Sequence, residues 1–184
     1  MRKEKNRSAI YIAVFIAGVM ILSVLGFIIN EQEGGNSYGK YSFLAKNGQW
    51  AVKINGADLS FNYLPQEVDS INVSKDIIQL IESTKMVYIT YDQNETDVQQ
   101  LATAQYSLDS AFQQINLFAI NAFTEAGKNI TQADCKNATA YVPVILMQMG
   151  NENSISLNNN CIILKGSPLM TADRIKYAVY GVIK

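Results

Sequence analysis

The stretch YSFLAKNGQWAVKINGADLSFNYLP, residues 41–65, contains two Asn-Gly pairs, and each pair separates runs in which apolar and polar residues alternate. An Asn-Gly pair between such runs is typical of a two-residue β-hairpin turn of type I′, in which both central residues need positive φ. The pairs Asn47-Gly48 and Asn55-Gly56 therefore predict a three-stranded antiparallel meander.

The two turns also fix the expected register of this meander. They place Ala45 opposite Trp50, and Trp50 opposite Phe61. This register gathers the large apolar side chains on one face: Tyr41, Phe43, Trp50, Val52, Ile54, Leu59, Phe61 and Tyr63. We expect that face to be buried, with Trp50 at its centre and packed against a long helix that contains Phe112 and Ile115.

Residues 9–29 form an uncharged and mostly apolar run. Its length matches a helix that spans a hydrocarbon layer of ~30 Å, and it exceeds the ~7–15 apolar residues of a cleaved signal peptide. Four basic residues precede the run: Arg2, Lys3, Lys5 and Arg7. The positive-inside rule therefore predicts an uncleaved signal-anchor in the cell membrane, with residues 1–8 in the cytoplasm and the C-terminal domain outside.

The remaining sequence divides into a tether and one domain. Residues 30–39 are a short segment with Gly and Ser, and residues 40–184 show no internal repeat or second composition regime. Within the apolar run, Ala9, Ala13 and Ala17 recur every four residues, a spacing that can pack two membrane helices together. The alternative is that these alanines face lipid.

The pattern after the meander predicts a mixed sheet in an α/β or α+β domain. The expected elements are a helix (residues 74–83), a strand (85–92), a long helix (94–127) and a strand (139–150). A strand that resumes after an asparagine interruption (161–165) and a final helix from Pro168 onward follow. The order is β-β-β-α-β-α-β-β-α. A strand, a long helix and another strand imply a parallel crossover.

Composition excludes several functional classes. The chain has no histidine, which removes Ser-His-Asp and Cys-His catalysis and His-ligated metals. It also lacks a phosphate-binding glycine loop and any dense basic stretch, so we expect no cofactor, no metal and no nucleic acid partner. The chain is not expected to be an enzyme.

Cys135 and Cys161 are the two cysteines of the chain. An even pair outside the cytoplasm favours a structural disulfide, and no Cys-x-x-Cys motif is present. The alternative is a thiol-disulfide enzyme that uses the two cysteines as a redox pair.

Four asparagines of the expected outer part lie in Asn-x-Ser/Thr triplets: Asn72, Asn94, Asn129 and Asn137. These triplets are acceptors for N-glycosylation, so the chain is a candidate glycoprotein.

Three acidic residues, Asp92, Glu95 and Asp97, cluster where the strand 85–92 gives way to the long helix. The carboxyl end of a parallel strand is a common place for ligands, so these residues together with Tyr91 could bind a cation or a sugar. The alternative is that acidic residues occupy the first turn of a helix because they offset its dipole.

Three stretches, together with the apolar run, carry a resemblance to other proteins: NATAYVPVILMQMGNENSI (137–155), NNCIILKG (159–166) and DRIKYAVYGVI (173–183). In this combination the chain resembles uncharacterised single-pass, membrane-anchored proteins of archaeal envelopes. The resemblance implies a location and no activity. We therefore expect a non-catalytic binding or envelope-assembly module, with an envelope protein or a glycan as its partner.

Overall fold

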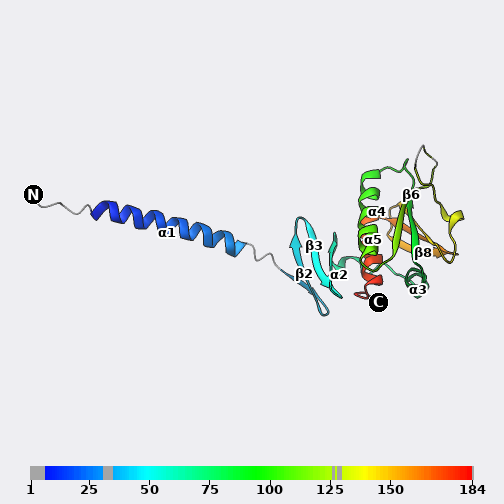
Figure 1. Cartoon of the computed structure of the whole chain (residues 1–184), viewed down its shortest axis with the longest axis horizontal. Coiled ribbons are helices and arrows are strands. Elements are labelled where there is room, and N and C mark those ends of the chain that lie inside the picture. Colours follow the sequence, from blue (N-terminus) through cyan, green and yellow to red (C-terminus); the bar gives the residue numbers. More distant parts are fainter. Residues whose placement is uncertain (1–6, 31–34, 126, 128–129, 184) are drawn as a thin grey trace, which may run out of the picture. The chain divides into compact units, whose positions relative to one another are not determined.

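The computed structural model describes residues 7–30, 35–125, 127 and 130–183. The chain divides into two compact units, Met1–Asn36 and Ser37–Lys184 (Figure 1). Residues 1–6, which include most of the basic N-terminus, and residues 31–34 of the expected tether lie outside the described residues.

The first unit contains helix α1, Arg7–Asn30. This helix covers the whole apolar run, residues 9–29, so a helix forms where the sequence predicts one. In the part of the chain that the structure describes, we find no helix that meets both the length and the apolarity needed to cross a membrane. The assignment of residues 9–29 as a membrane span stays a prediction.

The second unit begins with a four-stranded sheet in the order β1-β2-β3-β4. Its strands are Asn36–Tyr38, Tyr41–Lys46, Gln49–Ile54 and Ala57–Phe61. The predicted meander, β2 to β4, is confirmed: Asn47 and Asn55 have φ of 52° and 50°, and Trp50 lies opposite both Ala45 and Phe61. Strand β1 is an addition that the sequence analysis did not predict.

A second, five-stranded sheet has the order β6-β5-β7-β9-β8. In chain order, its strands are β5 (Met86–Tyr91), β6 (Phe118–Phe123), β7 (Val144–Met149), β8 (Ser154–Asn158) and β9 (Cys161–Gly166). Strands β6, β5, β7 and β9 run parallel to one another, and β8 runs antiparallel to β9. The predicted mixed sheet is therefore confirmed.

The predicted long helix, residues 94–127, is wrong. Helix α4 spans Val98–Gln113, the chain turns at Asn116 with φ of 58°, and the following residues form β6. The apolar residues of this segment are spaced so that both a helix and a short strand can bury them, and pairing with β5 favours the strand. The crossover from β5 through α4 consequently leads to β6, although β5 also pairs in parallel with β7.

The remaining helices are α2 (Pro65–Val68), α3 (Lys75–Ser83), α5 (Pro168–Val179) and the 3₁₀ turn η1 (Cys135–Asn137). The Ser74 side chain caps α3, since it accepts a hydrogen bond from the N–H of Ile77. The element order differs from the predicted one because β1, α2 and β6 are additional, and because the asparagine-interrupted run forms two strands, β8 and β9.

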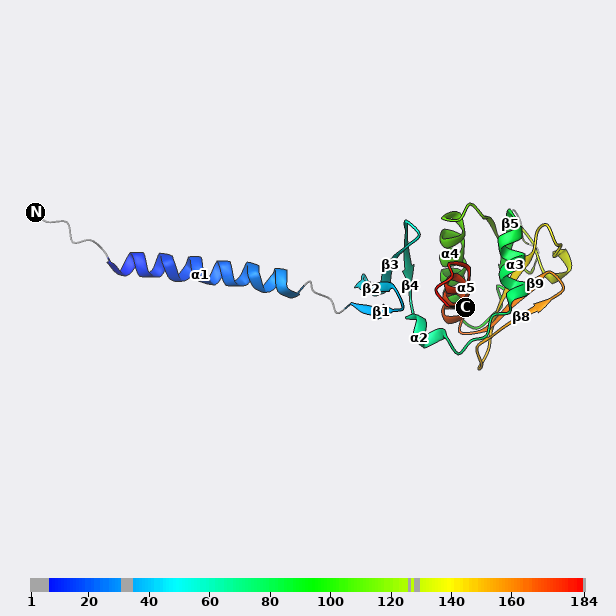
Figure 2. The ribbon, with the colours of Figure 1, turned by 90° about the horizontal axis from the view of Figure 1, so that it is seen from below.

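Helices α4 and α5 lie between the two sheets (Figure 2). Towards the five-stranded sheet, α5 contributes Ala172, Ile175 and Ala178 to the larger core. Towards the meander, it contributes Tyr177 to a separate core. Helix α5 is consequently buried on both sides.

The core beneath the meander is centred on aromatic rings. Phe61 stacks on Tyr177 with centroids 4.0 Å apart, and Phe43 meets both rings edge-on. The prediction that Trp50 is the buried centre, packed on the long helix, is wrong: Trp50 is half-buried at the margin of this core. The helix that covers the meander is mainly α5, because its tyrosines reach the sheet.

Replacing Phe61 by alanine should lower the free energy of unfolding of the full-length chain by ~3–5 kcal/mol, since it removes the stacked ring and leaves a cavity. Urea denaturation followed by the fluorescence of Trp50 measures the change. The exposed Leu44 supplies the control, because Leu44→Ala should change stability by less than ~0.5 kcal/mol. Equal effects of the two substitutions would contradict this core assignment.

Candidate functional site

The buried face of α5 that meets the meander is polar as well as aromatic. Asp173 is fully buried and its Oδ2 accepts hydrogen bonds from the backbone N–H of Asn62, at 2.6 Å, and of Tyr63, at 3.0 Å. Its Oδ1 lies 2.8 Å from the Nζ of Lys176. The carboxylate therefore joins the residues that follow β4 to the helix.

Lys176 is also buried, and its ammonium group is surrounded by acceptors. Nζ donates to the carbonyl of Ser60 and to the Oγ of Ser107 on α4, each at 2.8 Å, and it lies 4.4 Å from the centroid of the Phe61 ring. The ion pair with Asp173 adds a third close contact to these two hydrogen bonds. This lysine joins three elements: β4, α4 and α5.

Three neighbouring side chains extend the same network. Arg174 donates through Nε to the carbonyl of Ile71 at 2.7 Å. The hydroxyl groups of Tyr177 and Tyr180 donate to the carbonyls of Tyr63 and Ala111, each at 2.7 Å. Each of these long-range bonds ends on a backbone carbonyl, so α5 and the residue that follows it satisfy main-chain groups of the connection between β4 and α3 and of α4.

Burial determines the protonation behaviour of this network. Loss of solvation raises the pKa of Asp173 and lowers the pKa of Lys176, and in each case the opposite charge of the partner counteracts part of the change. Burial likewise raises the pKa of Tyr180 to about 12. The groups are held as structural partners and make no contact with a reactive centre among the described residues.

Replacing Lys176 by methionine should cost ~3–5 kcal/mol at neutral pH, because it leaves a buried carboxylate without its cation. Without the ammonium, the pKa of Asp173 in the folded state rises further above its unfolded value. A raised folded pKa means that stability is present at low pH and is lost as the pH rises through that pKa. The loss should therefore be smaller at about pH 5 than at about pH 7.5.

Urea titrations of the full-length chain at the two pH values test this expectation. Lys53→Met removes the same charge from an exposed position and should change stability little at either pH. A loss in Lys176→Met that does not depend on pH would contradict the assigned role of Asp173.

A cleft of about 230 Å³ lies where β4 approaches α4. We call it the β4–α4 cleft. Its lining combines polar and apolar surface and includes Asp58 and Ser60 of β4 and Thr103, Tyr106, Ser107 and Gln114 on or directly after α4. Lys176 binds two of the lining residues, Ser60 and Ser107, and so links the two walls of this cleft.

The acidic cluster predicted as a ligand site occupies the turn between β5 and α4. The Asp92 carboxylate accepts a hydrogen bond from the N–H of Asn94, and the Asp97 carboxylate accepts one from the N–H of Gln100 and caps α4. These contacts are those expected of turn and helix-cap residues. Tyr91 is buried, its ring lies edge-on to Phe123, and burial raises its pKa.

Glu95 is half-buried in the same turn. Across the described ranges, no three or more His, Cys, Asp or Glu side chains are grouped so that they could hold a metal ion. A cation or sugar site at Asp92, Glu95 and Asp97 stays a prediction.

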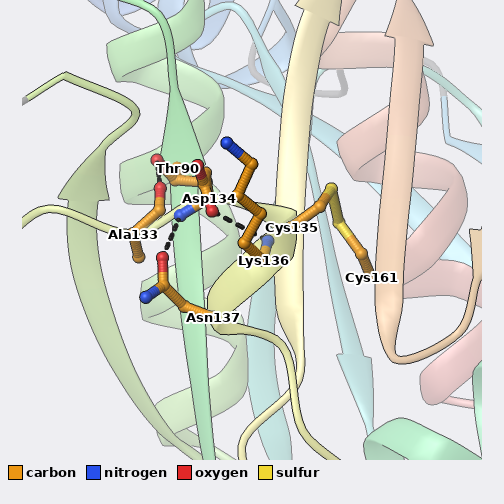
Figure 3. The surroundings of a disulfide bond; sticks show 7 residues. All are labelled: Thr90, Ala133, Asp134, Cys135, Lys136, Asn137 and Cys161. Carbon is orange, nitrogen blue, oxygen red and sulfur yellow. Dashed lines mark hydrogen bonds between the residues drawn. A yellow bond between two sulfur atoms is a disulfide. The ribbon is translucent and has the colours of Figure 1, made fainter.

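The predicted disulfide between Cys135 and Cys161 is confirmed (Figure 3). It joins η1 to the first residue of β9, and Cys161 is 1% exposed. The residues before η1 are held to β5, because the hydroxyl of Thr90 donates to the carbonyl of Ala133 at 2.8 Å. The disulfide therefore attaches η1 and the residues before it to the five-stranded sheet.

The candidate glycosylation sites differ in their surroundings. Asn72, Asn94 and Asn137 are exposed, whereas Asn129 lies outside the described residues. The amide of Asn94 donates to the carboxylates of Asp92 and Glu125, and Asn137 accepts a hydrogen bond from the N–H of Asp134. Whether these positions carry glycans stays a prediction.

Comparison of the chain with protein-family models, with curated proteins and with solved structures gives no match. The resemblance to archaeal envelope proteins stays a prediction.

The sequence analysis missed both the α5 network and the β4–α4 cleft. Asp173, Arg174 and Lys176 lie together in the final helix, which is an ordinary composition for a solvent-exposed helix. The partners of Asp173 lie about a hundred residues earlier in the chain, with a separation of 111 for Asn62. No local pattern in the sequence indicates this pairing.

Proposed function

We propose that this chain is a single-pass membrane protein whose second unit, Ser37–Lys184, lies outside the cytoplasm and binds a partner without catalysis. The observation that carries the proposal is the exposed apolar surface of α1. Nine large apolar side chains between Tyr11 and Leu22 are 49–73% exposed. The occupant that matches a helix that is apolar all round is the hydrocarbon of a bilayer.

The sequence of the complete apolar run supports this proposal. The structure describes side chains of α1 only from residue 11 to residue 23, whereas residues 9–29 contain no charged residue. A helix of this length extends about 30 Å, the thickness of the hydrocarbon core. Self-association through Ala9, Ala13 and Ala17 would then occur within the membrane.

The disulfide and the distribution of charges support the proposed orientation. A bridge between Cys135 and Cys161 suits an oxidising compartment. Basic residues precede the apolar run, and the acidic residues Glu31 and Glu33 follow it.

The titratable groups of the chain support a binding role without catalysis. The chain contains no histidine. The buried pair Asp173 and Lys176 is already engaged with the backbone of β4 and its extension, so neither group is available to take up or deliver a substrate proton. The β4–α4 cleft is left as a surface that can hold a partner.

Labelling of an introduced cysteine tests the proposed location. Because Cys135 and Cys161 are joined, Ser37→Cys supplies a free thiol at an exposed position just after the expected tether. A membrane-impermeant maleimide should label it in intact cells. The matched variant Asn6→Cys should be labelled only after lysis, and the reverse pattern would contradict the orientation.

The second candidate function is a thiol-disulfide enzyme that uses Cys135 and Cys161. The burial of Cys161 disfavours this function, because exchange requires an attacking thiolate to reach a sulfur atom. We expect the pair to have a reduction potential below about −300 mV, as structural bridges do. Equilibration of the full-length chain with glutathione and dithiothreitol buffers measures it, and a value well above that limit would favour the enzyme.

A further inference from the structure

We propose that Asn47 and Asn55 are sites of spontaneous deamidation, and that the isoaspartate formed at Asn55 releases the meander from α5. This inference goes beyond the proposed function and does not depend on it. It rests on three observations: both residues precede a glycine, both turns are exposed, and the contacts between β4 and α5 require one register of the meander.

Deamidation of an Asn-Gly pair consumes only water. The backbone nitrogen of the glycine attacks Cγ of the asparagine, the bond between Cγ and Nδ2 breaks, and the displaced nitrogen leaves as ammonia with the proton of the glycine N–H. Water then opens the cyclic imide at either of its carbonyl carbons. Opening at Cγ gives aspartate, whereas opening at the main-chain carbonyl gives isoaspartate, whose backbone passes through Cβ and Cγ and is one atom longer.

Both turns leave the reacting atoms accessible. Asn47, Gly48, Asn55 and Gly56 are all exposed. A Cβ placed on either glycine would have no heavy atom within 4 Å apart from those of the glycine and its chain neighbours. In the described part of the chain, the N–H of neither glycine donates to a backbone carbonyl, because each turn lies beyond the last residue pair of its strands. Each turn therefore has the space to rotate until the nitrogen meets Cγ.

Asn159 provides a comparison within the chain. It is exposed, it lies in the turn between β8 and β9, and its φ of 53° resembles the 52° and 50° of Asn47 and Asn55. The residue after it is Asn160 and not a glycine. A side chain on the attacking residue hinders the approach of its nitrogen, whereas glycine has no Cβ and rotates freely. We expect deamidation at Asn47 and Asn55 to be at least tenfold faster than at Asn159.

Aspartate, the first product, fits both turns. Its backbone has the same atoms as that of asparagine, and Asp-Gly pairs also favour turns of type I′. The new carboxylate at either position lies in solvent, because Asn47 and Asn55 are exposed. We therefore expect aspartate to leave the meander in its place on α5.

Isoaspartate at Asn55 does not fit. A two-residue turn sets the register of the strands that it joins, and an additional backbone atom changes how β3 continues into β4. Helix α5 fixes the position of β4 independently, because the carbonyl of Ser60 accepts from Lys176 and the N–H of Asn62 donates to Asp173. The two requirements conflict, so β4 loses its contacts with α5.

The turn at Asn47 differs, because it joins β2 to β3. The side chains of α5 that bind main-chain groups in this region bind β4 and the residues directly after it. Isoaspartate at Asn47 therefore alters β2 and leaves β4 on α5.

The reaction is measured on the full-length chain in neutral detergent at mildly alkaline pH, which speeds the attack of the backbone nitrogen. Peptide mapping by mass spectrometry gives the rate at each asparagine, and methylation by an isoaspartyl methyltransferase detects the isoaspartate. We expect both products at Asn47 and at Asn55. Rates at these two positions that do not exceed the rate at Asn159 would overturn the inference.

The structural consequence is measured by hydrogen exchange, with each variant compared before and after ageing until most of its Asn-Gly asparagine has reacted. Asn47→Gly keeps the Asn-Gly pair at Asn55, and Asn55→Gly keeps the pair at Asn47. Both variants retain the turn, because Gly-Gly pairs also adopt type I′. Aged Asn47→Gly should lose protection over residues 57–63, whereas aged Asn55→Gly should retain it.

Fresh Asn55→Asp separates the effect of the new charge from that of the additional backbone atom, and it should be protected like the wild type. Loss of protection in this variant or in aged Asn55→Gly, or unchanged protection in aged Asn47→Gly, would overturn the inference.

Discussion

The carboxylate of Asp173 and the ammonium of Lys176 hold the end of β4 against α5, and the arrangement of the second unit depends on this contact. A strand at the edge of a sheet has unpaired main-chain groups that must be satisfied when they are buried. Here two charged side chains of one helix supply the partners, because Asp173 accepts from N–H groups and Lys176 donates to a carbonyl and to Ser107. The meander is consequently joined to both α4 and α5.

Burying this ion pair constrains how the meander can dock. Each charge loses its hydration, and the loss is compensated only when all its hydrogen-bond partners are in place. A shift of β4 by one residue would turn the carbonyl of Ser60 away from Lys176 and the N–H of Asn62 away from Asp173. The stacked rings of Phe61 and Tyr177 require the same register. The aromatic core and the polar network therefore select one position of the meander on α5.

The features that could be predicted from sequence are those that depend on residues close together in the chain. The Asn-Gly turns and the pairing of Trp50 with Phe61 depend on neighbouring residues, and the disulfide depends on the presence of two cysteines. Strand β6 could not be predicted, because the apolar spacing between Ile115 and Ala122 fits a helix and a strand, and its pairing with β5 decides between them. The α5 network and the β4–α4 cleft join elements distant in sequence, so no motif indicates them. The burial of Trp50 could not be predicted for the same reason. The turns give its partners in the sheet, but the position of α5 determines which side chains of the meander are buried.

The same network connects the fold with the proposed binding role, because α5 covers the later part of the outer side of β4 and leaves Asp58 and Ser60 at the cleft. Hydrogen exchange of the Asp173→Ala variant, followed by mass spectrometry, tests the central claim that this carboxylate holds the meander on α5. We predict that peptides from residues 41–63 lose protection, while those from β5, β7 and β9 keep theirs. Unchanged protection of the meander, or an equal loss in both sheets, would contradict the account.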